Sequence, residues 1–211
     1  MKAISMSESL KWYTLIGYNL GRALIRFAAV ILSLVPVSIL WGEFYAIPGE
    51  LLSVMIVYGI GWALSRGGSE TADPSTAEVL ASAAAIWLAV GLLSALPFRF
   101  IAETIALNPE FLATPLLNPT LRAFRSLDTA VFEAFSGITG TGLTVTRDSS
   151  ALPATLQWWR SLLQWLGGIG VIVLILVFIR QSNGGVLDQY YQQRSPLGRT
   201  GIDLSDGEET T

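Results

Sequence analysis

The sequence contains no cysteine and no histidine. These absences exclude disulfides, thiolate nucleophiles and imidazole bases, and they remove the ligands that most zinc, copper and haem sites use. Charge is also scarce, because only 14% of the 211 residues are Asp, Glu, Lys or Arg, and the net charge is -3. No basic stripe is present that could neutralise a row of phosphates, so nucleic acid is not an expected partner. With no convincing carboxylate pair either, we expect that the protein is not an enzyme and has no covalent cofactor.

Apolar residues make up 52% of the chain, and the mean hydropathy is +0.53. Four charge-free apolar runs stand out, at residues 27–42, 51–65, 79–98 and 161–179. The last two match the roughly 20 residues that cross a hydrocarbon core of about 30 Å, whereas the first two need help from their flanks. The flanks supply this help: Arg22 and Arg26 precede the first run, and Tyr58 and Trp62 lie at the end of the second. We therefore predict an all-α, polytopic membrane protein with four transmembrane helices surrounded by lipid. The alternative for the first run, a cleaved signal peptide, is disfavoured by its long polar start.

The connections between the runs predict the organisation of the chain. Residues 43–50, which contain Pro48 and Gly49, are too short for anything but a hairpin turn between the first two spans. Ser75 or Thr76 is expected to cap the third span, with Glu78 in its first turn. Basic residues flank the spans on the side of the two termini, which predicts a plasma-membrane protein with both termini in the cytoplasm. The predicted parts are a cytoplasmic segment (1–26), a transmembrane hairpin (27–66), a helix-loop-helix unit (77–180) and a polar cytoplasmic tail (181–211).

A short apolar helix is predicted between the third and fourth spans, with Asp128 as its N-cap. It is too short to cross a bilayer, and from Gly137 onward it gives way to the sequence GITGTGLT. Irregular backbone at membrane depth is tolerated only where it lines water or ions, and glycine allows successive carbonyls to point to one side. The pattern favours a re-entrant pore helix followed by a filter loop that coordinates K+ through main-chain carbonyls. An extracellular turn is the alternative, but the helix, loop, helix order around the segment argues against it. The predicted ion-binding residues are Thr139, Gly140, Thr141 and Gly142.

Two dense motifs carry a resemblance to a known family. They are residues 132–145, FEAFSGITGTGLTV, and residues 159–171, WRSLLQWLGGIGV. In this order and spacing they closely resemble the first pore loop and the following helix of the Trk/Ktr/HKT superfamily of potassium transporters, TrkH type. The hairpin at 27–66 also resembles the extra N-terminal hairpin of that family.

The resemblance implies a K+ pore built from four helix, loop, helix repeats, a dimer of such chains and a cytoplasmic nucleotide-binding regulatory subunit. It also implies that Gly142 is the filter glycine that accompanies K+ permeation, since serine there can accompany Na+ selectivity. Gly140 departs from the family, which usually has threonine at that position. Only one pore loop is found in this sequence, so the other repeats are expected in cis, in trans as partner chains, or through self-association as a homotetramer. A non-conducting membrane subunit that retains a relic loop is the alternative function.

Several other residues carry predictions. Glu133, inside the membrane-entering helix, is a candidate vestibule charge that attracts cations, although the helix dipole and vestibule water could also hold it. Trp158, Trp159 and Trp165, with Arg160, are interpreted as interface anchors at the outer end of the fourth span. The glycines at 167, 168 and 170 are expected to permit close packing against the pore helix rather than to form a hinge.

Overall fold

The computed structural model describes residues 6–68, 75–108, 110, 118–146 and 152–194. All regular secondary structure in this part of the chain is helical, as predicted. The helices are α1 (Met6–Leu32), α2 (Leu34–Trp41), α3 (Ile47–Ser65), α4 (Thr76–Leu93), α5 (Ala95–Leu107), α6 (Pro119–Phe124), α7 (Leu127–Thr139) and α8 (Ala154–Arg194). Among the described residues, four segments are long and apolar enough to cross a membrane: Tyr13–Trp41, Ile47–Ser65, Thr76–Leu107 and Ala154–Leu176. The prediction of four membrane-spanning helices is confirmed at this level.

The first helix begins much earlier than the apolar run that predicted it. Residues 1–26 were predicted to form a separate cytoplasmic segment before the first span, but residues 6–26 are continuous with that span in α1. The apolar run therefore marked the loss of charge and not the start of the helix. A break at Ser33 separates α1 from α2, three residues before Pro36, because proline cannot donate the backbone hydrogen bond to the carbonyl four residues earlier.

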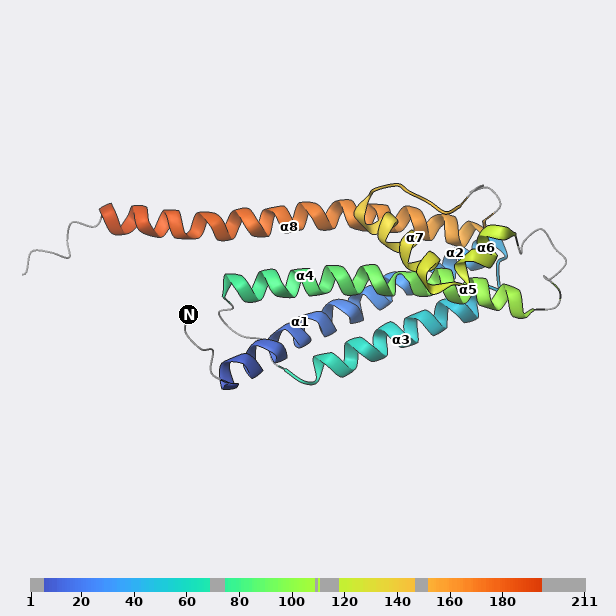
Figure 1. Ribbon diagram of the computed structural model, residues 1–211, viewed down its shortest axis with the longest axis horizontal. Helices are drawn as coiled ribbons and strands as arrows, with labels where there is room; N and C mark the ends of the chain where they lie inside the picture. The colour runs from blue at the N-terminus through green and yellow to red at the C-terminus, as the bar shows by residue number, and fades with distance from the viewer. Residues whose placement is uncertain (1–5, 69–74, 109, 111–117, 147–151, 195–211) are drawn as a thin grey trace, which may run out of the picture. The chain divides into compact units, whose positions relative to one another are not determined.

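The hairpin between α2 and α3 is shorter than predicted. Pro48 and Gly49 lie in the first turn of α3, not in the connecting turn, since proline is well tolerated there. α3 then packs along α1, and Figure 1 shows the two helices side by side with α4 on the other flank of α1. A Cβ on Gly21 would lie 2.5 Å from the carbonyl oxygen of Gly61, so the crossing requires small residues on both helices.

The third span is made of α4 and α5, with a break at Ser94. Ser75 caps α4 as predicted: its side chain accepts a hydrogen bond from the Glu78 amide, and the Glu78 carboxylate accepts one from the Ser75 amide at 2.7 Å. α5 continues to Leu107, well beyond the predicted end of the run at residue 98. The short helices α2, α5, α6 and α7 gather at one end of the bundle formed by α1, α3 and α4 (Figure 1).

The chain divides into two compact units, residues 1–171 and 172–211. The first unit holds the hydrophobic core, in which Phe98 and Phe124 lie with ring centroids 5.2 Å apart. The second unit contains the rest of α8. The helix runs to Arg194, so the first part of the predicted polar tail is helical, and the remainder of that tail lies outside the described residues. The sequence has no proline between Ala154, where α8 begins, and Pro196, which leaves the helix free to continue.

Candidate functional site

The short helix α7 carries the predicted filter loop at its C-terminal end. Its N-cap is Ser126, not Asp128 as the sequence suggested. Asp128 lies instead in the first turn, where the Ser126 hydroxyl donates a hydrogen bond to its carboxylate and where the helix dipole favours a negative charge. That hydrogen bond holds the pKa of Asp128 below its usual value.

Close packing fixes α7 against α8. A Cβ on Gly167 would lie 2.0 Å from the Ile138 carbonyl oxygen, and one on Gly137 would lie 3.0 Å from the Leu163 Cβ. Each helix therefore has a glycine where the other helix packs closely against it, as predicted for Gly167. Gly170 differs, because its missing side chain makes room for the ring of Trp87 on α4, and Gly168 faces open space.

The loop that follows α7 uses glycine where the backbone demands it. Gly140 caps the helix with φ = +69°, and Gly142 has φ = +72°. Neither position is crowded, because an added Cβ at either would meet no atom within 4 Å. The requirement is conformational: the left-handed region disfavours residues that carry a Cβ. Residues 139–145 are all exposed, although α7 just before them is buried along one face.

Hydroxyl groups tie the loop back to α7. The Thr139 hydroxyl donates to the Phe135 carbonyl at 2.6 Å, and the Thr141 hydroxyl lies 3.2 Å from that of Ser136. Ser136 in turn donates to the carbonyl of Leu143. These bonds direct the threonine side chains toward the helix and occupy the Leu143 carbonyl. The four predicted filter residues precede Leu143 in the chain.

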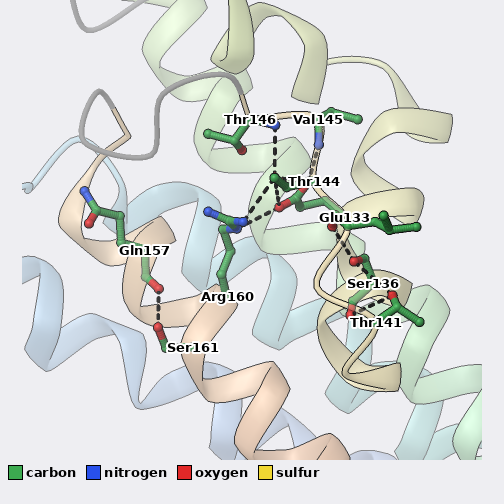
Figure 2. A network of polar contacts seen from close by, with 10 residues as sticks. Glu133, Ser136, Thr141, Thr144, Val145, Thr146, Gln157, Arg160 and Ser161 are labelled. Carbon is green, nitrogen blue, oxygen red and sulfur yellow. Dashed lines mark hydrogen bonds and ion pairs between the residues drawn. The ribbon is translucent and has the colours of Figure 1, made fainter.

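Glu133 has a different environment from the one expected of a vestibule charge. Its side chain is only 3% exposed and forms an ion pair with Arg160 of α8, Oε1 to Nε at 2.7 Å. The same carboxylate accepts hydrogen bonds from the Thr144 hydroxyl at 2.8 Å and the Val145 amide at 3.1 Å. The Arg160 guanidinium also donates to the Thr144 hydroxyl at 3.0 Å, one of the contacts drawn in Figure 2. One charge pair thus holds the segment that returns from the loop to the rest of the chain. We call Glu133, Thr144, Val145 and Arg160 the loop brace.

The predicted role of Trp159 as an interface anchor is wrong. Trp159 is fully buried, packs 6.1 Å from the ring of Phe27, and donates its indole N–H to the Ser94 carbonyl at 3.0 Å. Ser94 lies at the break between α4 and α5. Trp158 and Trp165 are exposed, as anchors would be. The sequence pattern assigned the same role to all three tryptophans, and only their burial in the fold distinguishes Trp159 from the other two.

A second buried polar cluster, which sequence reasoning missed, joins the N-terminal hairpin to α8. Glu43 accepts hydrogen bonds from the amides of Ala154 and Thr155 at 2.7 and 2.9 Å, so it caps the start of α8 from another part of the chain. Ser38 on α2 donates to the fully buried Glu50, and its oxygen lies 2.8 Å from the Thr155 hydroxyl. The only available signal was the presence of acidic residues next to apolar runs.

These features define a class: a helical membrane protein in which a short helix presents a glycine-containing, exposed loop beside a spanning helix. Residues 79–200 match the family described as "TrkH: Cation transport protein". Since the match covers more than half of the 211 residues, the chain belongs to the TrkH family of cation transport proteins.

Curated relatives agree with this assignment. The chain is 35% identical to the Trk system potassium uptake protein TrkI of Halomonas elongata over 165 residues, 74% of this chain and 31% of the relative. It is 35% identical to TrkH of the same organism over 117 residues, 50% of this chain and 24% of the relative. For TrkH of Escherichia coli the identity is 32% over 104 residues, 49% of this chain and 18% of the relative. These relatives are named as transport proteins, and the matched segment spans less than a third of each. No solved structure matches the chain.

Proposed function

We propose that this chain takes part in K+ transport across the plasma membrane by contributing one filter loop, residues 139–142, to a pore. The observation that carries the proposal is the pair of left-handed glycines, Gly140 and Gly142, in an exposed loop at the C-terminal end of α7. The relatives are named potassium uptake proteins, which supports K+ as the transported ion.

The chemistry proposed for the loop is coordination by backbone. Carbonyls of Thr139, Gly140, Thr141 and Gly142 would replace part of the hydration shell of a K+ ion. The negative C-terminal end of α7, a re-entrant pore helix in this proposal, adds a favourable potential without an ionised group. The hydroxyls of Thr139 and Thr141 already have partners on α7, which supports main-chain coordination over side-chain coordination.

Glu133 is proposed to act as a positioning residue and not as a free vestibule charge. A carboxylate that is 3% exposed and bound to an arginine offers little field to an approaching ion. Its contacts with Thr144 and Val145 instead support a role in holding the outer arm of the loop.

One loop supplies a quarter of a fourfold filter, so the remaining repeats must come from elsewhere. We propose, in order of preference, further repeats that continue this chain or a split gene, assembly with other subunits, and self-association of four copies. A cytoplasmic nucleotide-binding regulatory subunit is a further proposed partner. The basic residues at the ends of the spans support an orientation with both termini in the cytoplasm.

Potassium flux tests the pore proposal. The full chain is reconstituted in liposomes, alone and with candidate partner chains, and uptake of K+ and Na+ is measured for the native protein, Gly142→Ser and Gly168→Ala. Gly142→Ser should lower the ratio of K+ to Na+ uptake, because it strains a left-handed position in the loop. Gly168→Ala, in open helical surface, should leave the ratio unchanged. If no assembly shows K+ uptake that depends on residue 142, the pore proposal fails and a non-conducting subunit is favoured.

A further inference from the structure

Two arginines on α1 line hollows on both sides of that helix. Arg22 and Arg26 are one turn apart, and both are exposed. On one side they line a hollow of about 340 Å³ against the start of α4, and on the other they line one of about 270 Å³ that reaches Ser65 at the end of α3. The same pair of positive charges therefore serves two adjoining concave surfaces.

The walls of these hollows suit an anion with an apolar attachment. Tyr18, Asn19 and Ser82 supply hydroxyl and amide groups to the larger hollow, and the remaining wall is aliphatic. Tyr18 holds the Arg22 side chain in place. Arg22 donates a hydrogen bond to the Tyr18 hydroxyl at 3.1 Å, and its guanidinium lies 5.7 Å from the centroid of the Tyr18 ring. Among the described residues, no carboxylate lines either hollow and neither arginine forms an ion pair. Two guanidinium groups thus face these surfaces without a counter-charge from the described chain.

The depth of the pair can be read from α3. This helix has 19 residues and so spans about 28 Å, close to the thickness of a hydrocarbon core of about 30 Å. Its last residue, Ser65, packs against the backbone of α1 at Gly21, the residue before Arg22. A Cβ on Gly21 would lie 2.5 Å from the Ser65 nitrogen. Arg22 therefore lies where α3 leaves the hydrocarbon, and Arg26 lies one turn deeper, within reach of that boundary by snorkelling. Lipid phosphates occupy this level of a bilayer.

We propose that Arg22 and Arg26 form a binding site for the phosphate headgroup of an anionic phospholipid, with its glycerol and acyl chains against the aliphatic wall formed by α1 and α4. Guanidinium groups bind phosphate oxygens in a bidentate manner, and basic pockets between membrane helices hold such headgroups. The ligand chemistry is shared by free phosphate, but the aliphatic wall and the depth favour the lipid. The site is separate from the filter loop and does not depend on transport.

Native mass spectrometry of the full chain tests this proposal. The protein is released from detergent in the presence of equal amounts of phosphatidylglycerol and phosphatidylcholine, and the retained lipids are counted. The native chain should retain phosphatidylglycerol preferentially. The double substitution Arg22→Gln with Arg26→Gln should weaken that retention about thirtyfold, since two arginines are removed near the anionic group. Arg66→Gln is the matched control, because Arg66 lies at the same end of α3, stacks on Trp62 at 3.7 Å, and lines neither hollow.

The outcomes separate cleanly. Loss of phosphatidylglycerol from the double variant but not from Arg66→Gln supports the site. If the double Gln variant does not fold, the double substitution Arg22→Lys with Arg26→Lys is measured in its place and should retain most of the binding. Equal loss in the Arg66 variant, or equal retention of the two lipids by the native chain, overturns the proposal. Displacement of the lipid by millimolar inorganic phosphate also overturns it, because the site would then be one for a free anion.

Discussion

Glu133→Gln tests whether the loop brace holds the segment after the filter loop. The substitution keeps the size of the side chain but removes the charge and turns one acceptor oxygen into an amide donor. Three donors converge on the carboxylate: Arg160 Nε at 2.7 Å, the Thr144 hydroxyl at 2.8 Å and the Val145 amide at 3.1 Å. A glutamine can still accept from some of them, but its NH₂ group would face a donor.

The magnitude follows from burial. Hydrogen bonds to charged groups contribute about 1.5–3 kcal/mol each, and breaking a buried ion pair from one side costs about 3–5 kcal/mol. Since the amide retains part of the bonding, we expect the free energy of local opening at Val145 to fall by about 3 kcal/mol. That change corresponds to roughly a hundredfold faster amide exchange in the segment 144–146.

Hydrogen exchange measured by mass spectrometry on the full chain in detergent is the assay. Glu103→Gln is the matched control, because Glu103 also pairs with arginines, Arg99 at 2.5 Å and Arg125 at 3.0 Å, but does not contact the loop. Arg160→Lys should give an intermediate effect, since it keeps the charge and loses the fork that reaches Thr144. Unchanged exchange at 144–146 in Glu133→Gln, or the same acceleration in Glu103→Gln, would refute the reasoning. This measurement needs no ion flux, so it stands apart from the pore proposal.

Two further substitutions test the packing of α8. Gly167→Ala should lower the thermal unfolding temperature, because its Cβ would lie 2.0 Å from the Ile138 carbonyl oxygen, and overpacking of this kind costs about 1–3 kcal/mol. Trp159→Phe should reduce the free energy of unfolding by about 1–3 kcal/mol, since it leaves the buried Ser94 carbonyl without its indole donor.

Each of these has a neighbour that serves as a control. Gly168→Ala adds a methyl group where no atom lies within 4 Å, and Trp158→Phe changes a side chain that is 49% exposed. If either control destabilises the protein as much as its partner, the proposed contact is not the cause. Denaturation in mixed micelles, followed by circular dichroism, measures all four variants.

Local sequence patterns predicted much of the backbone. Apolar runs identified four spans because a bilayer requires long uncharged helices, and Ser75 with Glu78 predicted the start of α4 because a capping box is complete within four residues. Glycine at 140 and 142 predicted an unusual backbone conformation, and both have positive φ. The boundaries were less accurate, since α1 and α5 extend through charged or polar residues where the apolar pattern stops.

Partners distant in sequence could not be predicted in this way. Glu133 pairs with Arg160 across the loop, and Glu43 caps α8 from more than one hundred residues away. A buried charge in an apolar environment must find a partner, so the sequence signals that one exists. It does not say which one, because that depends on how the helices cross.

The sequence by itself determined that this protein is helical, enters a membrane and carries a loop with glycine where left-handed backbone is needed. These properties depend on hydropathy and on the conformational range of single residues, which are local. The tertiary structure alone decided that Trp159 is core, that Glu133 braces the loop, and that the α2–α3 hairpin is tied to α8. Each outcome depends on how helices distant in sequence cross; the pairing of Glu133 with Arg160, for example, accompanies the close approach of α7 and α8 at Gly137 and Gly167.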